Sequence, residues 1–188
     1  MAFDLQIDID RKQLRALDPR RLERSMLKAM RRAGSTALRD MRSEASKRVR
    51  RRKRIKAKAV REALIIRRPK GKQTLDSLDW RIDVRHRPVR VSDYPHRQTR
   101  RGVSVAINRG KRTVIKGAFV ATMRSGHRGV FVRRGARRLP IDEVFASRVV
   151  DALLHRGEAD GVLERGRKSL VDGYHRLLRI ELGKLVPG

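Results

Sequence analysis

Apolar positions in the first quarter of the chain follow the spacing of one long amphipathic helix. They recur every three or four residues between about residues 19 and 50, which places them on one face of an α-helix. Asp18 followed by Pro19 is typical of a helix N-cap with proline in the first turn. The stripe consists of Leu22, Met26, Met30, Ala33, Ala37, Met41, Ala45 and Val49. The opposite face is densely basic.

Shorter patterns flank this helix. Residues 5–10 (LQIDID) alternate apolar and acidic side chains, which predicts a short strand. Ile55, Ala59 and Ala63 have the spacing of a second short helix whose register is ambiguous. Residues 63–66 (ALII) resemble a strand, and a turn follows them.

The middle of the chain alternates with a period of two, as strands do. The alternating segments are residues 80–91, 103–108, 113–122 and 129–134, with a turn predicted at NRGK (108–111). Pro140 ends the pattern. This part therefore predicts a β-rich core.

Helical spacing returns after Pro140. Asp142 and Glu143 are expected to open a helix that ends at Gly157, with an apolar stripe of Phe145, Val149 and Leu153. A second stripe runs toward Gly183 and consists of Leu163, Leu170, Tyr174, Leu177 and Leu178. Gly166 and Gly173 weaken the prediction that this last helix is unbroken.

These patterns predict one α+β domain over residues 1–188, in which a long N-terminal amphipathic helix packs on a small antiparallel β-sheet and C-terminal helices follow. Its three parts are an N-terminal strand, helix and basic segment (1–66), a β-rich core (67–141) and C-terminal helices (142–188). We expect Phe119 and Phe131 to cover the helix stripe at Met30, Ala33, Ala37 and Met41.

Charge narrows the class of partner. The chain has 50 Lys and Arg against 20 Asp and Glu, a net charge of +30, so nucleic acid is the first expected partner and an acidic protein the second. Residues 47–61 contain ten Lys or Arg and no acid. The candidates for contact with nucleic acid or a neighbouring protein are Arg48, Arg50, Arg51, Arg52, Lys53, Arg54, Lys56 and Lys58. A solvated basic face is the alternative.

Patterns for other chemistry are missing from the sequence. Gly126 and Gly129 precede a strand instead of the helix that a phosphate-binding loop requires. Ser125 and His127 lack the setting of a nucleophilic triad, and the five histidines lack metal-ligand spacing. The chain has no cysteine, no signal-peptide pattern and no apolar run of membrane-spanning length. We expect no catalytic residue, cofactor, metal or membrane contact, and a location on the cytosolic side.

Residues 110–145 (GKRTVIKGAFVATMRSGHRGVFVRRGARRLPIDEVF) resemble the bacteriophage minor tail protein Z family, the tail completion proteins of long-tailed, lambda-like phages. The matching motifs are a Gly-Lys turn at 110–111, Ala118-Phe119, residues 125–131 with Arg133, and residues 138–141 with Glu143 and Phe145. The basic helix of the N-terminal part is similar in composition.

The resemblance implies a non-enzymatic protein of the virion at the head-proximal end of the tail, located in the host cytoplasm during assembly. It would act in tail completion, head-tail joining and positioning of the genome end for ejection. The implied partners are other tail and connector proteins, double-stranded DNA in the channel and further copies in a ring, expected to be a hexamer. In this interpretation Phe119, Gly126, Gly129 and Phe131 belong to the structural core. The alternatives are a general basic nucleic-acid-binding protein and an adaptor whose charge meets acidic neighbours.

Overall fold

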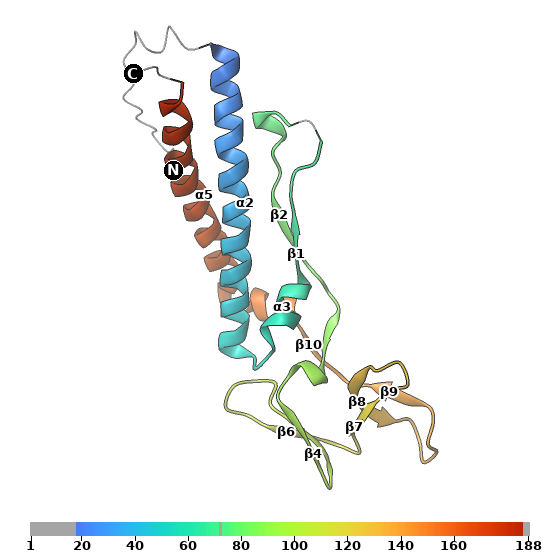
Figure 1. The fold of residues 1–188 in the computed structure, drawn as a ribbon. Helices are drawn as coiled ribbons and strands as arrows, with labels where there is room; N and C mark the ends of the chain where they lie inside the picture. The colour runs from blue at the N-terminus through green and yellow to red at the C-terminus, as the bar shows by residue number, and fades with distance from the viewer. Residues whose placement is uncertain (1–17, 72, 186–188) are drawn as a thin grey trace.

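The computed structural model describes residues 18–71 and 73–185 as an elongated molecule, with two long helices at one end and small sheets at the other (Figure 1). The helices are α2 (Pro19–Arg52), α3 (Ala57–Ala63), α4 (Val149–Leu154) and α5 (Glu158–Gly183), with 3-10 turns at Leu75–Ser77, Val91–Asp93 and His155–Gly157. The strands are β1 (Leu64–Arg67), β2 (Arg81–Val84), β3 (Pro88–Arg90), β4 (His96–Thr99), β5 (Gly102–Val105), β6 (Thr113–Lys116), β7 (Phe119–Thr122), β8 (Arg128–Arg133), β9 (Ile141–Glu143) and β10 (Phe145–Arg148). The chain is therefore a mixed helix-and-sheet protein. The strand predicted at residues 5–10 lies outside the described residues.

Helix α2 begins and ends close to where the sequence predicts. The Asp18 side chain accepts a hydrogen bond from the Arg20 N–H at 3.0 Å, and Pro19 occupies the first turn. The helix continues to Arg52, two residues beyond the predicted end. Its buried residues include Ala29, Ala33, Ala37, Leu38, Ala45 and Val49.

The main partner of α2 is α5, a helix contact that the sequence did not predict; the sheet that lies along α2 is the small β1–β2 hairpin. The two helices run antiparallel, because Lys28 pairs with Glu181 near one end (3.0 Å) and Arg48 pairs with Glu158 near the other (2.9 Å). Small residues line their contact, and small residues allow two helix backbones to approach closely.

The glycines of α5 belong to this contact and do not break the helix. An added Cβ on Gly173 would lie 3.6 Å from the Ala33 Cβ, and one on Gly166 would overlap the Met41 side chain. From the sequence alone, both glycines weaken the prediction that this helix is unbroken. Helix packing instead compensates for their low intrinsic helix propensity, which costs about 1 kcal/mol each.

The β1–β2 hairpin lies along another side of α2 (Figure 1). Trp80, just before β2, packs directly over Gly34 of α2, where an added Cβ would overlap three atoms of the indole ring. The predicted strand over residues 80–91 is divided in two, because β2 ends at Val84 and β3 begins at Pro88.

The strands form four small antiparallel sheets instead of the single predicted sheet. Their orders are β1–β2, β10–β3, β4–β5–β6 and β7–β8–β9. One apolar cluster connects them to the C-terminal half of α2 and to α3, α4 and α5. Its members include Ala45, Val49, Val60, Leu64, Val91, Tyr94, Val103, Val130, Val149, Leu153 and Val162. The core therefore lies at the junction between the helices and the sheets.

Phe119 and Phe131 do not cover the α2 stripe, so that prediction is wrong. They pair across β7 and β8, with ring centroids 6.3 Å apart, in a sheet beyond the C-terminal end of α2 (Figure 1). Phe131 is 6% exposed, and the Arg133 guanidinium lies 5.2 Å from the centre of the Phe119 ring. The positions predicted as their partners, Ala33 and Met41 among them, contact α5 instead.

Gly126 and Gly129, both expected in the structural core, differ in role. Gly126 has a φ of +79° in the turn between β7 and β8, a conformation that favours glycine. Gly129 lies within β8, where an added Cβ would meet the Phe131 ring and a Glu143 oxygen at 2.9 Å.

The helix predicted from Asp142 is wrong in its first half. Residues 141–143 pair with β8 and residues 145–148 pair with β3, and helix α4 begins only at Val149. Strand pairing has overridden the helical spacing, which leaves Phe145 48% exposed. Pro140 precedes β9 directly, so it separates two strands and does not end the β-rich region.

Candidate nucleic-acid interface

The densest part of the basic segment 47–61 lies at the end of α2, where backbone hydrogen bonds hold it against the loop after β5. The last turn of α2 consists of Arg50, Arg51 and Arg52. Lys53 then becomes extended and forms an antiparallel bridge with Asn108. The Arg54 N–H donates to the Ile107 carbonyl (2.9 Å) and the Arg109 N–H to the Arg52 carbonyl (3.1 Å). These backbone bonds place the loop after β5 against the end of α2.

This junction encloses a hollow of about 480 Å³ that carries four guanidinium or ammonium groups. Its lining residues are Arg51, Arg52, Lys53, Asn108, Arg109, Asp151, Ala152 and His155. Asp151 is the acid among them, and it already accepts the Arg148 N–H (3.2 Å) and lies 3.4 Å from the Arg148 guanidinium. The hollow, which we call the junction hollow, therefore has an excess of positive charge.

The arginines around the junction hollow retain most of their donors for a ligand. Arg50, Arg51 and Arg54 are exposed and Arg52 is half-buried. Within residues 18–71 and 73–185, none of these four forms an ion pair. The planar guanidinium donates two parallel hydrogen bonds to phosphate. The geometry therefore suits a phosphate-bearing ligand.

Arg48 is the candidate that the structure separates from this group. Its guanidinium donates to Glu44 (2.8 Å) and to Glu158 (2.9 Å), and its side chain is 24% exposed. These hydrogen bonds, the one with Glu44 foremost, raise the pKa of Arg48 above its usual value. Gly161 of α5 leaves the space that the guanidinium occupies. Arg48 thus joins α2 to α5.

The remaining three lysine candidates have partners of their own. Lys53 lines the junction hollow and donates from Nζ to Asn108 Oδ1 at 2.9 Å. Lys56 donates to the Ser92 carbonyl (3.1 Å), and Lys58 lies 4.0 Å from Glu62 within α3. Lys56 and Lys58 do not line the hollow.

Sequence reasoning missed Asn108, Arg109 and His155 as members of this site. The NRGK segment was interpreted only as a turn, and it does form one between β5 and β6. More than fifty residues separate Arg109 from Arg52 along the chain, and the local pattern holds no signal that joins them.

His127 has a carboxylate partner of its own. Its Nε2 lies 3.0 Å from Glu143 Oε1, and the other Glu143 oxygen lies 3.8 Å from Arg90. The imidazole also stands edge-on to Phe131, with centroids 6.2 Å apart. These contacts connect the β7–β8 turn with β9 and β3, and Ser125 is exposed in the same turn.

Three observations complete the description. Among the residues that the structure describes, no three His, Cys, Asp or Glu side chains gather closely enough to hold a metal ion. None of the described helices has the length and apolar character needed to span a bilayer. The chain matches no family model, and comparisons with curated proteins and with solved structures return no similar protein.

Proposed function

We propose that this chain is a structural component of the tail of a long-tailed bacteriophage. It acts at the head-proximal end in tail completion and head-tail joining, and it holds the end of the double-stranded genome for ejection. Several copies, six in our proposal, form a ring with neighbouring tail and connector proteins. The motifs of residues 110–145 support the tail assignment.

The junction hollow is the observation that supports contact with DNA. Four cationic side chains from α2 and the loop after β5 converge there, beside exposed Arg50 and Arg54. Lys and Arg that contact phosphates release condensed counterions, so such binding is independent of base sequence and weakens steeply with salt. A protein that holds any genome end needs this kind of contact.

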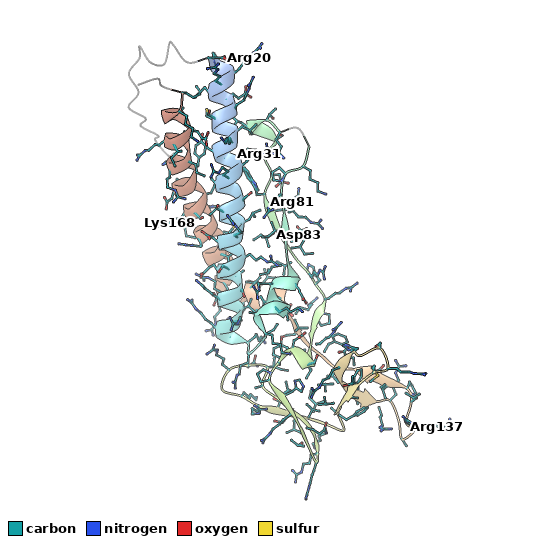
Figure 2. The ribbon with its side chains drawn as sticks, in the orientation of Figure 1. Arg20, Arg31, Arg81, Asp83, Arg137 and Lys168 are labelled. Atoms are coloured by element: carbon teal, nitrogen blue, oxygen red, sulfur yellow. The ribbon has the colours of Figure 1, made fainter. Side chains whose placement is uncertain are left out.

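Exposed arginines far from the junction hollow provide a control for the loss of net charge alone. Arg20 and Arg31 project from the N-terminal half of α2, and Arg137 lies at the opposite end of the molecule (Figure 2). All three are exposed. Replacing them with Gln removes as much charge as replacing Arg51, Arg52 and Arg109, but leaves the junction hollow intact.

The test compares these two triple variants in binding to random-sequence duplex DNA across a range of salt concentrations. We expect the Arg51→Gln, Arg52→Gln, Arg109→Gln variant to bind about tenfold or more weakly, with a log–log salt slope shallower by about 2–3. The control variant should change both quantities much less. Equal losses in the two variants would refute a localised DNA site.

A particle assay tests the tail assignment separately. If the junction hollow holds the genome end, phage carrying the Arg51, Arg52 and Arg109 variant should incorporate the protein and join heads to tails, yet lose infectivity. Failure of that variant to enter tails would favour the adaptor alternative, in which the same charges meet acidic neighbours. The chain's absence from purified particles would refute the tail role itself.

A further inference from the structure

A second hollow, of about 670 Å³, runs along strand β1. Four consecutive strand residues, 64–67, line it, whereas none of the β2 residues 81–84 does. Successive side chains of a strand point to opposite faces of a sheet. A hollow bordered by four consecutive residues therefore follows the strand's edge, on the side away from β2. We call it the β1 groove.

The hydrogen-bond pattern of the hairpin leaves backbone N–H and C=O groups of β1 pointing into the β1 groove, away from β2. The Arg85 N–H donates to the Ala63 carbonyl at 2.8 Å, so residues 63 and 85 form a hydrogen-bonded pair. Such pairs alternate along an antiparallel ladder, which makes 64/84 and 66/82 non-hydrogen-bonded pairs in the observed register. The N–H and C=O of Ile66 and the C=O of Leu64 therefore point away from β2. The described part of the chain supplies no partner for these three groups.

The β1 groove is strongly cationic. Six basic residues line it: Arg42, Arg61, Arg67, Arg68, Lys70 and Arg85. Glu62 is the acid in the lining, and it lies 4.0 Å from Lys58. The Arg42 Nε is buried and has no hydrogen-bond partner within the described residues. The groove thus combines an unpaired strand edge with an excess of positive charge.

We propose that the β1 groove receives residues 4–10 of a second copy of this chain, which add to β1 as a third strand. This segment (DLQIDID) alternates Leu5, Ile7 and Ile9 with three aspartates and one glutamine, and it has no basic residue. Strand addition satisfies the unpaired backbone groups of an edge and uses side chains for specificity. A two-stranded hairpin is only marginally stable, so the third strand also supports β1 and β2.

The two faces of the hairpin suit the two faces of this segment. Leu64 and Ile66 lie on one face, and Leu64 is fully buried in the core. Arg67 lies on the other face, where it pairs with Asp83 at 2.8 Å. The apolar residues of the added strand extend the first face, and its aspartates lie on the same side as Arg67.

Chain length favours a second copy over the same chain. Residue 10 is eight residues before Asp18, a link that spans at most about 29 Å. Arg42, at one end of the groove, lies about 36 Å along α2 from Asp18 at 1.5 Å per residue, beyond the reach of this link. The other end approaches Trp80, which packs over Gly34 about 24 Å along α2 from Asp18, so the link can reach that end alone. A neighbouring copy has no such restriction, and a head-to-tail contact of this kind closes into rings. The proposal requires neither DNA nor the tail assignment.

The absence of cysteine from the chain makes site-specific cross-linking a direct test. Full-length Ile9→Cys and full-length Ile66→Cys are mixed and treated with a short bis-maleimide. A cross-linked dimer containing one of each variant is expected. The control mixture pairs Ile9→Cys with Val114→Cys, because Val114 is exposed on β6, outside the groove. Equal cross-linking in both mixtures overturns the proposal, and so does a link that forms only within one chain carrying both Ile9→Cys and Ile66→Cys.

Oligomeric state provides the second test, by light scattering at physiological ionic strength. The wild-type chain is expected to associate, and the Asp4→Asn, Asp8→Asn, Asp10→Asn variant to dissociate at least tenfold more readily. Ile66→Pro is expected to act in the same way, because it removes the outward N–H while keeping the bonds to β2; edge strands tolerate proline. The fluorescence of Trp80, the chain's one tryptophan, checks that each variant retains the packing against α2. A wild-type chain that stays monomeric at all concentrations overturns the proposal, whatever it does with DNA.

Discussion

Replacing Gly34 with Ala tests the contact between α2 and the residue before β2. Alanine is favoured over glycine inside a helix by about 0.8–1.0 kcal/mol. At Gly34 the new methyl group would overlap three atoms of the Trp80 ring, and overpacking of this kind costs about 1–3 kcal/mol. The indole is a rigid ring, so we place the cost in the upper part of that range. Gly34→Ala should therefore lower the free energy of unfolding by about 1–2 kcal/mol.

Gly173→Ala is the matched control on the facing helix. Its methyl group would lie 3.6 Å from the Ala33 Cβ, an ordinary van der Waals distance. The helix preference should then be gained in full, about 0.8–1.0 kcal/mol. For a chain of this size 1 kcal/mol corresponds to about 2–4 °C in Tm. We expect Tm to rise by about that amount in Gly173→Ala and to fall in Gly34→Ala.

A double-mutant cycle isolates the contact, with unfolding followed by circular dichroism. In a Trp80→Ala background the overlap disappears, so Gly34→Ala should become stabilising by about 1 kcal/mol. The coupling energy between positions 34 and 80 should accordingly be about 2–3 kcal/mol. A coupling energy near zero, or a rise in Tm for Gly34→Ala in the wild-type background, would show that Trp80 does not lie over Gly34.

Three further predictions concern other parts of the molecule. Phe131→Ala should lower the free energy of unfolding by about 3–5 kcal/mol in a denaturant titration, because the ring is buried. Phe145→Ala, at a half-exposed ring, should lower it by less than half as much. Equal losses in the two variants would contradict the observed strand register. Arg48→Gln should lower Tm without weakening DNA binding, since Glu44 and Glu158 lose their shared partner. A folded variant with lower DNA affinity would show that Arg48 belongs to the DNA interface. Hydrogen bonds from Lys28 and Lys184 lower the pKa of Glu181, so its contribution to stability is complete above the ordinary Glu pKa of about 4.3 and is lost as pH falls through the lowered pKa. Glu181→Gln should therefore flatten the acid end of the stability–pH curve, whereas the control Glu164→Gln, at an exposed residue, should not. Identical curves for wild type and Glu181→Gln would refute the pairing.

Elements with strong local signals could be predicted from the sequence. Asp18-Pro19 and the stripe that follows locate α2 to within two residues of its observed end. The predicted short helix around Ala59 and the strand after it are present as α3 and β1. Each of these elements depends on residues that are close together in sequence.

Predictions that required knowledge of distant partners were wrong. The Ala33–Ala37 face of α2 contacts α5, more than a hundred residues later, and the glycines that allow this approach only weakened the prediction of an unbroken α5. Residues 141–148 have helical spacing but pair as strands with β8 and β3. In the candidate site, the sequence identified the arginines of α2 but not Arg109, which backbone bonds bring to Arg52.

Because α2 and α5 run antiparallel, a label at the end of α5 would report the orientation of the molecule in images. The start of α2 and the end of α5 lie together at one end, whereas the junction hollow lies at the other end of α2 (Figure 1). Helix α5 has 26 residues and is about 39 Å long, and it begins beside Arg48. A compact label attached at the end of α5, near Gly183, therefore marks a point about 40 Å from the arginines that we assign to DNA. In averaged images of a particle, such labels around a ring would report whether the junction hollows point toward the channel axis or away from it.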